Sequence, residues 1–405
     1  MNIRRIGLGG RIWAIAVLTT AALALVVPAN LAQASPGNDV SAADTVGTLL
    51  SLKSSTSAVP IPGSVQRMSY FSRTSANRSI LVTGDLFLPS APWTGPGERR
   101  LISYAYGTQG QGDQCAPSVS GRTSPLAENV LIGALMNAGY AVVATDYQGL
   151  GTPELHSYTD RVASGRAVLD AARAALASGR GGLTRKSRVA LYGYSQGGGA
   201  VAAAAELAKS YAPELSIVGT VAGAPVVDLV ATAKAMDGGP AMGDIGYMFN
   251  SLISRHPKLA AQKRRDLNSR GLAFLKAVAV QCDKDTESAF GGTDSRTLTT
   301  DGRSMADLLN SVPWVHWVER ERIGNVAPKA PVLVVSAAHD DTVPTAASVA
   351  LVRSWRLLGG KVGYSEVGIP HLGFGADHAA TAVPTVPLGL SWLGDRFNEP
   401  EMPRS

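Results

Sequence analysis

The stretch from 187 to 206 constrains the fold of this chain more than any other. It reads SRVALYGYSQGGGAVAAAAE: a short apolar run, the pentapeptide GYSQG at 193–197, and then a run of glycine and alanine. A buried strand, a Gly-x-Ser-x-Gly turn and a closely packed helix form a sharp bend that exposes a serine at the carboxyl end of a sheet. Because the pentapeptide alone also arises by chance in a glycine-rich chain, the flanking strand and helix carry the prediction that Ser195 is a nucleophile.

Strand and helix patterns alternate on both sides of this turn. Apolar strand patterns lie at 99–106, 140–145, 189–192, 216–222, 330–337 and 361–367, and helical patterns lie at 129–138, 161–177, 196–210, 345–358 and 388–397. Such alternation predicts parallel strands joined by right-handed crossovers. Residues 64–90 alternate apolar and polar residues around a polar turn at 75–77, which predicts an antiparallel hairpin at one edge. We therefore expect an α/β fold with a mostly parallel central sheet.

The region 228–325 breaks this rhythm. It shows helical patterns, including 259–276 and 305–317, and no clear strand. We expect a mainly helical cap, inserted into a core formed by 64–227 and 326–405. The apolar content of this cap suits either an acyl-binding site or the cap's own core; it comes from Met236, Met242, Met248, Phe249, Trp314 and Trp317. Residues 35–63 are rich in Ser, Ala and Thr, and we expect them to form a loosely tied arm.

The N-terminus has the pattern of a targeting segment. Three arginines at positions 4, 5 and 11 precede an apolar run at 12–27, and Ala32-Gln33-Ala34 is a small-x-small cleavage site. We expect residues 1–34 to be a secretion signal peptide that is cleaved after about Ala34, which makes the protein secreted. An uncleaved membrane anchor is the alternative, although the apolar run is short for a membrane span.

Export changes how charge and cysteine content are interpreted. The chain has a formal net charge of +6, and three of these charges are the arginines of 1–34, which leaves an ordinary +3 after cleavage. No block of basic residues interleaves with aromatic ones, so a nucleic-acid partner is not expected. Cys115 and Cys282 are the only cysteines. In an exported chain two cysteines most simply form one disulfide, with two free thiols as the alternative.

A serine nucleophile needs a base, and the base needs an acid that orients it. In this architecture the acid follows the serine in chain order, and the histidine follows the acid. The segment VLVVSAAHDDTVP at 332–344 places Asp340 and Asp341 just past a strand, where catalytic groups gather. We favour Asp340 over Asp341 as the acid because of its spacing to Val343-Pro344.

The candidate base is His371, which comes just after the last predicted strand in the segment GIPHLG at 368–373. A loop after the last strand is where a base must lie to reach Ser195. His378, near a predicted helix start, is the alternative, and His339 is expected to make only local hydrogen bonds.

Two backbone N–H groups are needed to stabilise the oxyanion that develops during attack on a carbonyl. The residue after the nucleophile, Gln196, supplies the first. The second is expected from the loop after the strand at 99–106, which reads GTQG at 107–110 and offers Thr108 and Gln109.

Four segments together resemble the secretory lipase family, which includes secreted fungal lipases such as Candida lipase A and actinobacterial relatives. They are CAPS at 115–118, DYQGLG at 146–151, the GYSQG turn, and DDTVP at 340–344, in the order that this family has. The resemblance implies an α/β-hydrolase fold in which a helical cap covers the active site. It corresponds here to the insertion 228–325.

The resemblance also implies roles for single residues. Ser195, Asp340 and His371 match the family triad, and Cys115 matches a cysteine that pairs with one in the cap, here Cys282. Gln109 stands where the family has an acidic residue whose backbone N–H helps to form the oxyanion hole. Neither a cofactor nor a metal is implied.

We therefore expect a secreted serine carboxylic-ester hydrolase, similar to triacylglycerol lipases. Its substrate would be a small-molecule ester or lipid; a transient contact with a lipid interface fits this function, and no stable protein partner is implied. Alternatives are a secreted acyltransferase, a feruloyl-type esterase or a peptidase on the same fold, or a non-catalytic hydrolase-like binding protein. The peptidase alternative predicts an acidic pair in the cap, and no obvious pair is visible in the sequence among Asp237, Asp244, Asp283 and Asp285.

Overall fold

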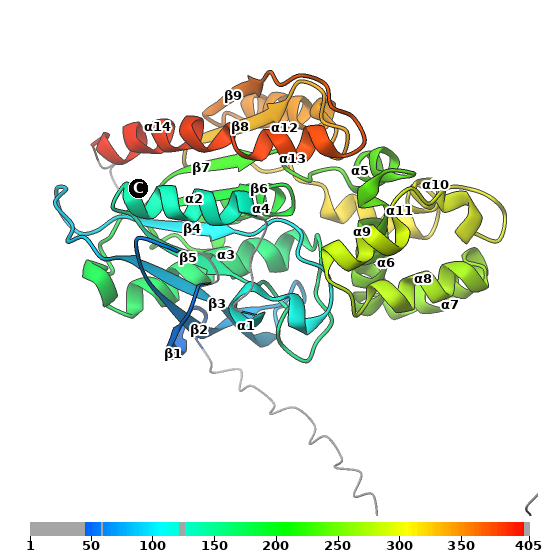
Figure 1. Ribbon diagram of the computed structural model, residues 1–405, viewed down its shortest axis with the longest axis horizontal. Coiled ribbons are helices and arrows are strands. Elements are labelled where there is room, and N and C mark those ends of the chain that lie inside the picture. Colours follow the sequence, from blue (N-terminus) through cyan, green and yellow to red (C-terminus); the bar gives the residue numbers. More distant parts are fainter. Residues whose placement is uncertain (1–44, 58–59, 121–125, 401–405) are drawn as a thin grey trace, which may run out of the picture. The chain divides into compact units, whose positions relative to one another are not determined.

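The computed structural model describes residues 45–57, 60–120 and 126–400, so the expected signal peptide lies outside the described residues. These residues build a nine-stranded sheet with the strand order β1-β2-β3-β5-β4-β6-β7-β8-β9 (Figure 1). The strands are β1 (Leu49–Ser55), β2 (Gly63–Arg73), β3 (Ser79–Pro89), β4 (Leu101–Ala105), β5 (Ala141–Thr145), β6 (Val189–Tyr194), β7 (Ile217–Gly223), β8 (Val332–Ala337) and β9 (Val362–Val367).

The direction of the strands follows the predicted pattern. Strands β4 to β9 pair in parallel, and β4, β5, β6, β7 and β8 are buried or nearly so on both faces. Strands β1, β2 and β3 are antiparallel and form one edge of the sheet. The mixed α/β sheet is therefore confirmed. One part of the expected arm is corrected: residues 49–55 form the edge strand β1, which pairs with β2.

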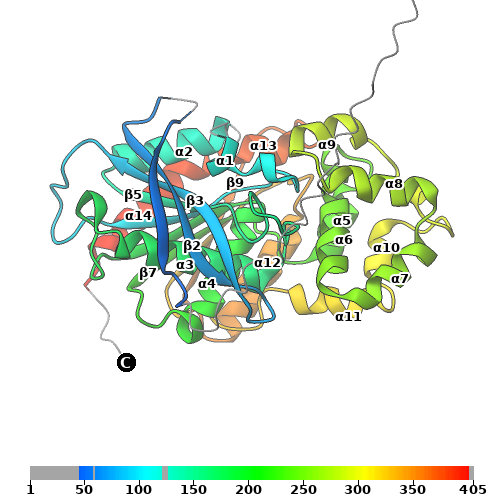
Figure 2. The ribbon, with the colours of Figure 1, turned by 90° about the horizontal axis from the view of Figure 1, so that it is seen from below.

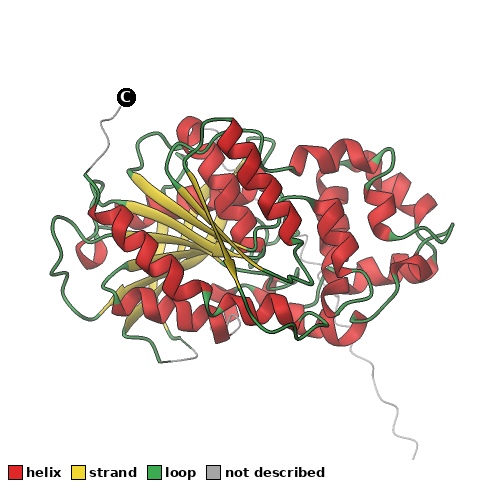
Figure 3. Ribbon diagram, turned by 90° about the horizontal axis from the view of Figure 1, so that it is seen from above, coloured by secondary structure: helices red, strands yellow, loops and turns green. Residues whose placement is uncertain are grey.

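Helices cover both faces of the sheet (Figures 2 and 3). On one face α3 and α4 pack against the central strands. Helix α12 is linked to α4, since the indole N–H of Trp355 donates to Glu206 (2.9 Å). On the other face α2 and α14 pack against the sheet and against each other. The core helices are α1 (Pro117–Ser120), α2 (Leu126–Asn137), α3 (Arg161–Ala177), α4 (Gln196–Tyr211), α12 (Thr345–Leu357), α13 (Ala376–Ala382) and α14 (Thr385–Asn398).

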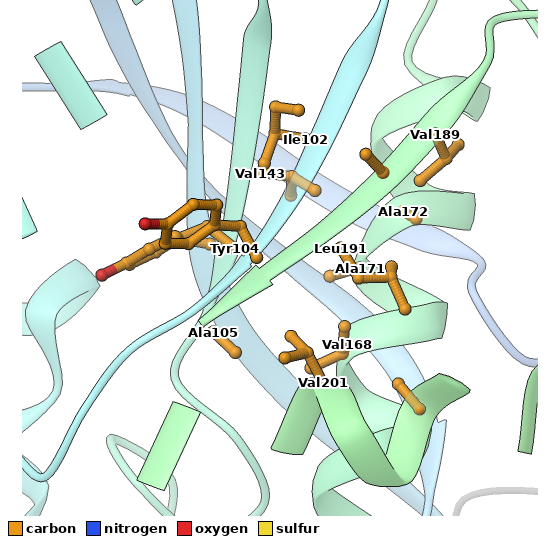
Figure 4. Packing of buried hydrophobic residues seen from close by; sticks show 14 of the residues in the cluster. Ile102, Tyr104, Ala105, Val143, Val168, Ala171, Ala172, Val189, Leu191 and Val201 are labelled. Atoms are coloured by element: carbon orange, nitrogen blue, oxygen red, sulfur yellow. The ribbon is translucent and has the colours of Figure 1, made fainter. Parts of the chain in front are cut away.

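Small residues bring the two central helices close to the sheet and to each other (Figure 4). Ala171 and Ala172 of α3 lie among Val189 and Leu191 of β6 in the buried core. Where α3 crosses α4, a Cβ atom added to Gly165 would lie 2.9 Å from the backbone nitrogen of Ala204. The glycine and alanine content that surrounds the GYSQG turn therefore serves close helix packing, which holds the turn in place.

Between β7 and β8 the described chain forms helices and no strand. These are α5 (Leu229–Met236), α6 (Gly243–Arg255), α7 (Pro257–Asp266), α8 (Ser269–Val278), α9 (Asp283–Phe290), α10 (Met305–Leu309) and α11 (Trp314–Val318). Two predicted helices are shorter than expected. The first is interrupted before α8, where the Asn268 side chain accepts the N–H of Gly271 (3.1 Å) and caps a new helix. The second is interrupted between Leu309 and Trp314, a segment that contains Pro313, which has no N–H to donate.

These helices have a hydrophobic core of their own. Met236, Met242, Met248, Phe249 and Trp314 are fully or almost fully buried in it. Of the two interpretations of this apolar content, core packing is the correct one for these five residues. In the part of the chain that the structure describes, no helix is both long enough and apolar enough to cross a membrane.

Candidate active site

Ser195 lies at the turn between β6 and α4 with φ 60° and ψ −121°, a conformation that is unfavourable for a residue with a side chain. The turn is possible because its flanking residues are glycines. A Cβ atom on Gly193 would lie 2.3 Å from the carbonyl oxygen of Gly197, and one on Gly197 would lie 2.0 Å from that of Ala105. The predicted strand, turn and helix are confirmed, and the strained backbone is typical of functional sites.

A chain of hydrogen bonds leads from Ser195 to a buried carboxylate. The Oγ atom of Ser195 lies 2.9 Å from Nε2 of His378, and Nδ1 of His378 lies 2.8 Å from Oδ2 of Asp340. The Asp340 side chain is fully buried. Its other oxygen accepts the N–H groups of Thr342 (3.0 Å) and Val343 (2.7 Å), which fixes the carboxylate at the end of β8.

The prediction that His371 is the base is wrong on this geometry. Nδ1 of His371 lies 2.5 Å from the carboxylate of Asp377, and the His371 side chain is 67% exposed. The loop after β9 does not end at His371. It continues to α13, and the first turn of this helix presents His378, the alternative base, to Ser195.

Asp341 does not contact the imidazole of His378 but supports the segment that carries it. Its carboxylate accepts the N–H of Gly375 (2.6 Å) and the N–H of His378 itself (3.2 Å). The choice of Asp340 over Asp341 as the acid beside the histidine therefore agrees with the geometry, and Asp341 holds the backbone.

The fully buried Asp377 holds the same loop from its other side. Its carboxylate accepts the N–H groups of Leu372 (2.6 Å) and Gly373 (3.3 Å) as well as the contact from His371. The hydrogen bond from Leu372 first, and then the one from His371, keep the pKa of Asp377 below its ordinary value. Asp377 is a residue that sequence reasoning missed.

The predicted oxyanion residues Gln196, Thr108 and Gln109 differ in the contacts that they make. In the described structure the backbone N–H groups of Gln196, Thr108 and Gln109 have no acceptor within the protein. Thr108 lines the pocket at Ser195. The side-chain amide nitrogen of Gln109 donates to Glu128 (3.2 Å), and its backbone carbonyl accepts the N–H of Asp283 (2.9 Å).

Two buried side chains contact the Ser195 turn and the neighbouring loop of Gly107. The amide nitrogen of Gln196 lies 3.1 Å from Nε2 of His156, and burial lowers the pKa of His156 to about 4. Glu128 accepts the N–H of Gly107 (2.5 Å), so this N–H is already occupied. Neither His156 nor Glu128 was a sequence candidate, because a buried polar residue carries no local motif.

A cavity of about 440 Å³ opens beside Ser195 and His378, at the carboxyl ends of the strands. The core lines it with apolar residues such as Leu131 and with polar ones such as Glu128, and the cap adds charged side chains. The cap residues that line it are Pro240, Ala241, Asp244, Asp283, Lys284 and Glu287. A larger cavity of about 530 Å³ lies at the opposite ends of the strands, next to Arg188 and Ser216, and is remote from Ser195.

The cap does provide an acidic pair. Asp244 of α6 and Asp283 of α9 line the same cavity, which the sequence did not reveal because 39 residues separate them. Burial, followed by the charge of Asp283, raises the pKa of Asp244 well above its ordinary value. Burial raises the pKa of Asp283 to about 6, against the opposing effect of Lys284.

The predicted disulfide between Cys115 and Cys282 is confirmed, and both cysteines of the chain are used. The disulfide and two backbone hydrogen bonds join the cap to the loop that carries Thr108, and we call this set of contacts the seam. Gln111 donates its N–H to the carbonyl of Gln281 (3.0 Å), and the N–H of Asp283 donates to Gln109. The seam brings Asp283 to the cavity.

Comparison with known proteins identifies related sequences and structures. The sequence profile described as secretory lipase matches residues 118–403. A Mycobacterium tuberculosis protein described as a probable inactive lipase is 30% identical over 308 residues, which cover 73% of this chain and 66% of that protein. A secreted triacylglycerol lipase of Malassezia globosa is 29% identical over 307 residues, with shares of 73% and 65%. The aligned part of this chain thus spans slightly less than two thirds of either relative.

Among solved structures, Candida antarctica lipase A superimposes with a TM-score of 0.69 at 24% sequence identity, covering 80% of this chain and 77% of that one. At this identity the likeness shows a common α/β-hydrolase fold. Because the family profile matches more than half of the chain, and the fold agrees with it, this chain belongs to the secretory lipase family.

Proposed function

We propose that this protein is a secreted serine carboxylic-ester hydrolase that acts through an acyl-enzyme on Ser195. The observation that carries the proposal is the unbroken chain of hydrogen bonds from Asp340 through His378 to Ser195. In such a chain the imidazole takes the serine proton, and the carboxylate holds the correct tautomer and stabilises the imidazolium that forms. Membership of a family of lipases supports the same chemistry.

The reaction follows from these positions. Oγ of Ser195 attacks the ester carbonyl carbon while its proton passes to Nε2 of His378. The N–H groups of Gln196 and Thr108 donate to the carbonyl oxygen as it becomes negative. His378 then gives its proton to the departing alcohol oxygen, and the C–O bond breaks. A water molecule, deprotonated by the same imidazole, attacks the acyl-enzyme and releases the acid.

For the substrate, we propose a lipid-like ester with its acyl part in the cavity beside Ser195. The core side of this cavity includes the apolar side chains of Leu131, Ala379 and Ala382. The helices between β7 and β8 act as a cap over it. The signal-like segment 1–34 and the secreted relatives support export.

A second candidate is a hydrolase for esters or amides with a protonated amine. The acidic pair of Asp244 and Asp283 favours it, because two carboxyl groups in one cavity suit an ammonium group. Matched p-nitrophenyl esters of alanine and of propionic acid separate the two candidates. A clear preference for the alanine ester supports the second, and a preference for the propionate ester removes it.

The main test combines labelling with hydrolysis. A fluorophosphonate probe should label the wild-type protein at Ser195, and Ser195→Ala should lose both the label and the hydrolysis of p-nitrophenyl butyrate. Ser210→Ala, an exposed serine at the far end of α4, serves as the control and should retain both. An unlabelled but folded wild-type protein would leave the non-catalytic alternative in place. Transfer of the acyl group to an added alcohol in preference to water would favour the acyltransferase alternative.

A further inference from the structure

A buried carboxyl group on α2 is hydrogen-bonded to the loop that offers the second oxyanion donor. Glu128 lies in the first turn of α2 and is only 7% exposed. Its Oε1 atom accepts the N–H of Gly107 (2.5 Å), and its Oε2 atom accepts the side-chain amide nitrogen of Gln109 (3.2 Å). Glu128 therefore contacts both the residue before Thr108 and the residue after it.

The amide group of Gln109 closes this arrangement. Its nitrogen also donates to the carbonyl oxygen of Gly107 (3.2 Å), so one amide group with two hydrogens serves both Gly107 and Glu128. We refer to the three hydrogen bonds among Gly107, Gln109 and Glu128 as the loop clamp. The backbone of Thr108 lies between two residues that the loop clamp holds.

The loop clamp lies next to the reacting serine. Gly107, Thr108 and Glu128 all line the cavity beside Ser195. A Cβ atom on Gly107 would lie 3.2 Å from Oε1 of Glu128 and 3.6 Å from the carbonyl oxygen of Tyr194, the residue before the nucleophile. Because the loop runs this close to the turn, a small shift of its backbone moves the N–H of Thr108 relative to the carbonyl that Ser195 attacks.

The burial of Glu128 needs a reason, since a buried carboxyl group is costly unless it is hydrogen-bonded. An apolar side chain would pack beside Leu131 in the same cavity wall at a lower cost. Charge does not supply the reason either, because an ionised carboxylate near the site would oppose the negative charge that develops on the substrate oxygen. What Glu128 provides is two acceptor atoms in fixed positions, which specify one conformation of the loop.

We propose that Glu128 is a positioning residue for the oxyanion hole, which holds the loop 107–109 so that the N–H of Thr108 can donate to the developing oxyanion. The proposal rests on the function proposed above. Glu128 acts through Thr108, and a donor of this kind matters more in the transition state than in the bound ester. Loss of the loop clamp should therefore lower kcat much more than it changes KM.

Glu128→Gln is the principal test. It keeps the shape of the side chain but replaces one acceptor oxygen by an NH₂ group, so either Gly107 or Gln109 then faces a second donor. We expect kcat on p-nitrophenyl butyrate to fall about tenfold or more, with KM changed less than twofold. The affinity for butylboronic acid should fall by a similar factor, because its tetrahedral adduct with Ser195 places an oxygen in the oxyanion hole. Glu154→Gln, at an exposed position outside the cavity, is the matched control and should keep both values.

A reversed pair separates positioning from a general effect on the fold. Gln109→Glu alone should lower kcat, because two carboxyl groups then face each other. In the double variant Gln109→Glu/Glu128→Gln an amide again faces a carboxylate, so kcat should recover about threefold or more relative to Glu128→Gln. The recovery is partial, because a carboxylate at position 109 cannot donate to the carbonyl of Gly107.

Thermal unfolding checks that each variant is folded. If Glu128→Gln does not fold, Gln109→Ala, which removes two of the three clamp hydrogen bonds, is tested by the same comparison of kcat with KM. Wild-type kcat and boronate affinity in the folded variant, beside an active wild-type protein, would overturn the positioning role and leave the proposed function standing. So would a double variant no more active than Glu128→Gln. A folded wild-type protein that hydrolyses no ester would instead reject the proposed function, and the positioning role with it.

Discussion

Nε2 of His378 lies 2.9 Å from Oγ of Ser195, although 183 residues separate the two in the sequence. Seven residues before His378, the more exposed His371 is paired with Asp377. The two histidines share one short segment, so their substitutions form a matched pair.

We predict that His378→Ala lowers kcat on p-nitrophenyl butyrate by about a thousandfold or more, because the serine then has no base. His371→Ala should retain activity within about threefold. Steady-state kinetics of the two purified variants gives the comparison. A larger loss in His371→Ala than in His378→Ala would contradict the assignment of the base.

Asp341→Asn tests whether the carboxylate of Asp341 holds the backbone that carries His378. An amide can accept only one of the two N–H groups that the carboxylate of Asp341 accepts, so the start of α13 and His378 should lose part of their alignment. We expect kcat to fall about tenfold with little change in KM. Asp340→Asn should cost roughly a thousandfold or more, because the imidazole loses its orienting carboxylate. Equal losses in the two variants would show that the aspartates do not have these separate roles.

Reduction of the disulfide should destabilise the protein strongly. The bond closes a loop across a sequence separation of 167 residues, for which chain entropy gives an upper figure of about 5 kcal/mol. Urea unfolding with and without a reducing agent measures the effect. The double variant Cys115→Ala/Cys282→Ala controls for the reducing agent, since its midpoint should not respond. An unchanged wild-type midpoint under reduction would argue against a stabilising bond.

The raised pKa of Asp283 predicts a pH-dependent stability. Because the folded pKa is about 6 and the unfolded value is near the ordinary 3.8, the native state binds more protons between these values, and this group makes the protein less stable as pH rises from about 4 to 6. Asp283→Asn should therefore stabilise the protein at pH 7.5 by an amount on the order of 1 kcal/mol, and by less at pH 4. Thermal unfolding at both pH values measures this difference.

Asp285→Asn is the matched control, since Asp285 is exposed in the same first turn of α9. It should show no such gain. A gain of equal size at pH 4 and pH 7.5 in Asp283→Asn would rule out titration of Asp283 as its source.

The sequence was sufficient for those parts of the site that depend on local geometry. The turn at Ser195 requires glycine at 193 and 197 for steric reasons, and these glycines are visible as a motif. Asp340 follows a strongly apolar strand, so its place at the edge of the sheet could be inferred.

Other parts depend on contacts that have no local pattern. His378 reaches Ser195 through a loop in which phenylalanine, a residue that does not favour positive φ, adopts it between two glycines. The acidic pair arises from α6 and α9, which meet only in the folded cap. Strand β1 is a Ser-rich and partly exposed edge, so its pairing with β2 produces no clear hydrophobic alternation.

The seam at Cys282 limits how the cavity can admit a bulky molecule. On that side the disulfide and the hydrogen bonds of Gln111 and Asp283 fasten the cap to the loop that carries Thr108. A bulky substrate therefore has to enter while this edge of the cap stays joined to the loop, and cleavage of the disulfide should relax that restriction.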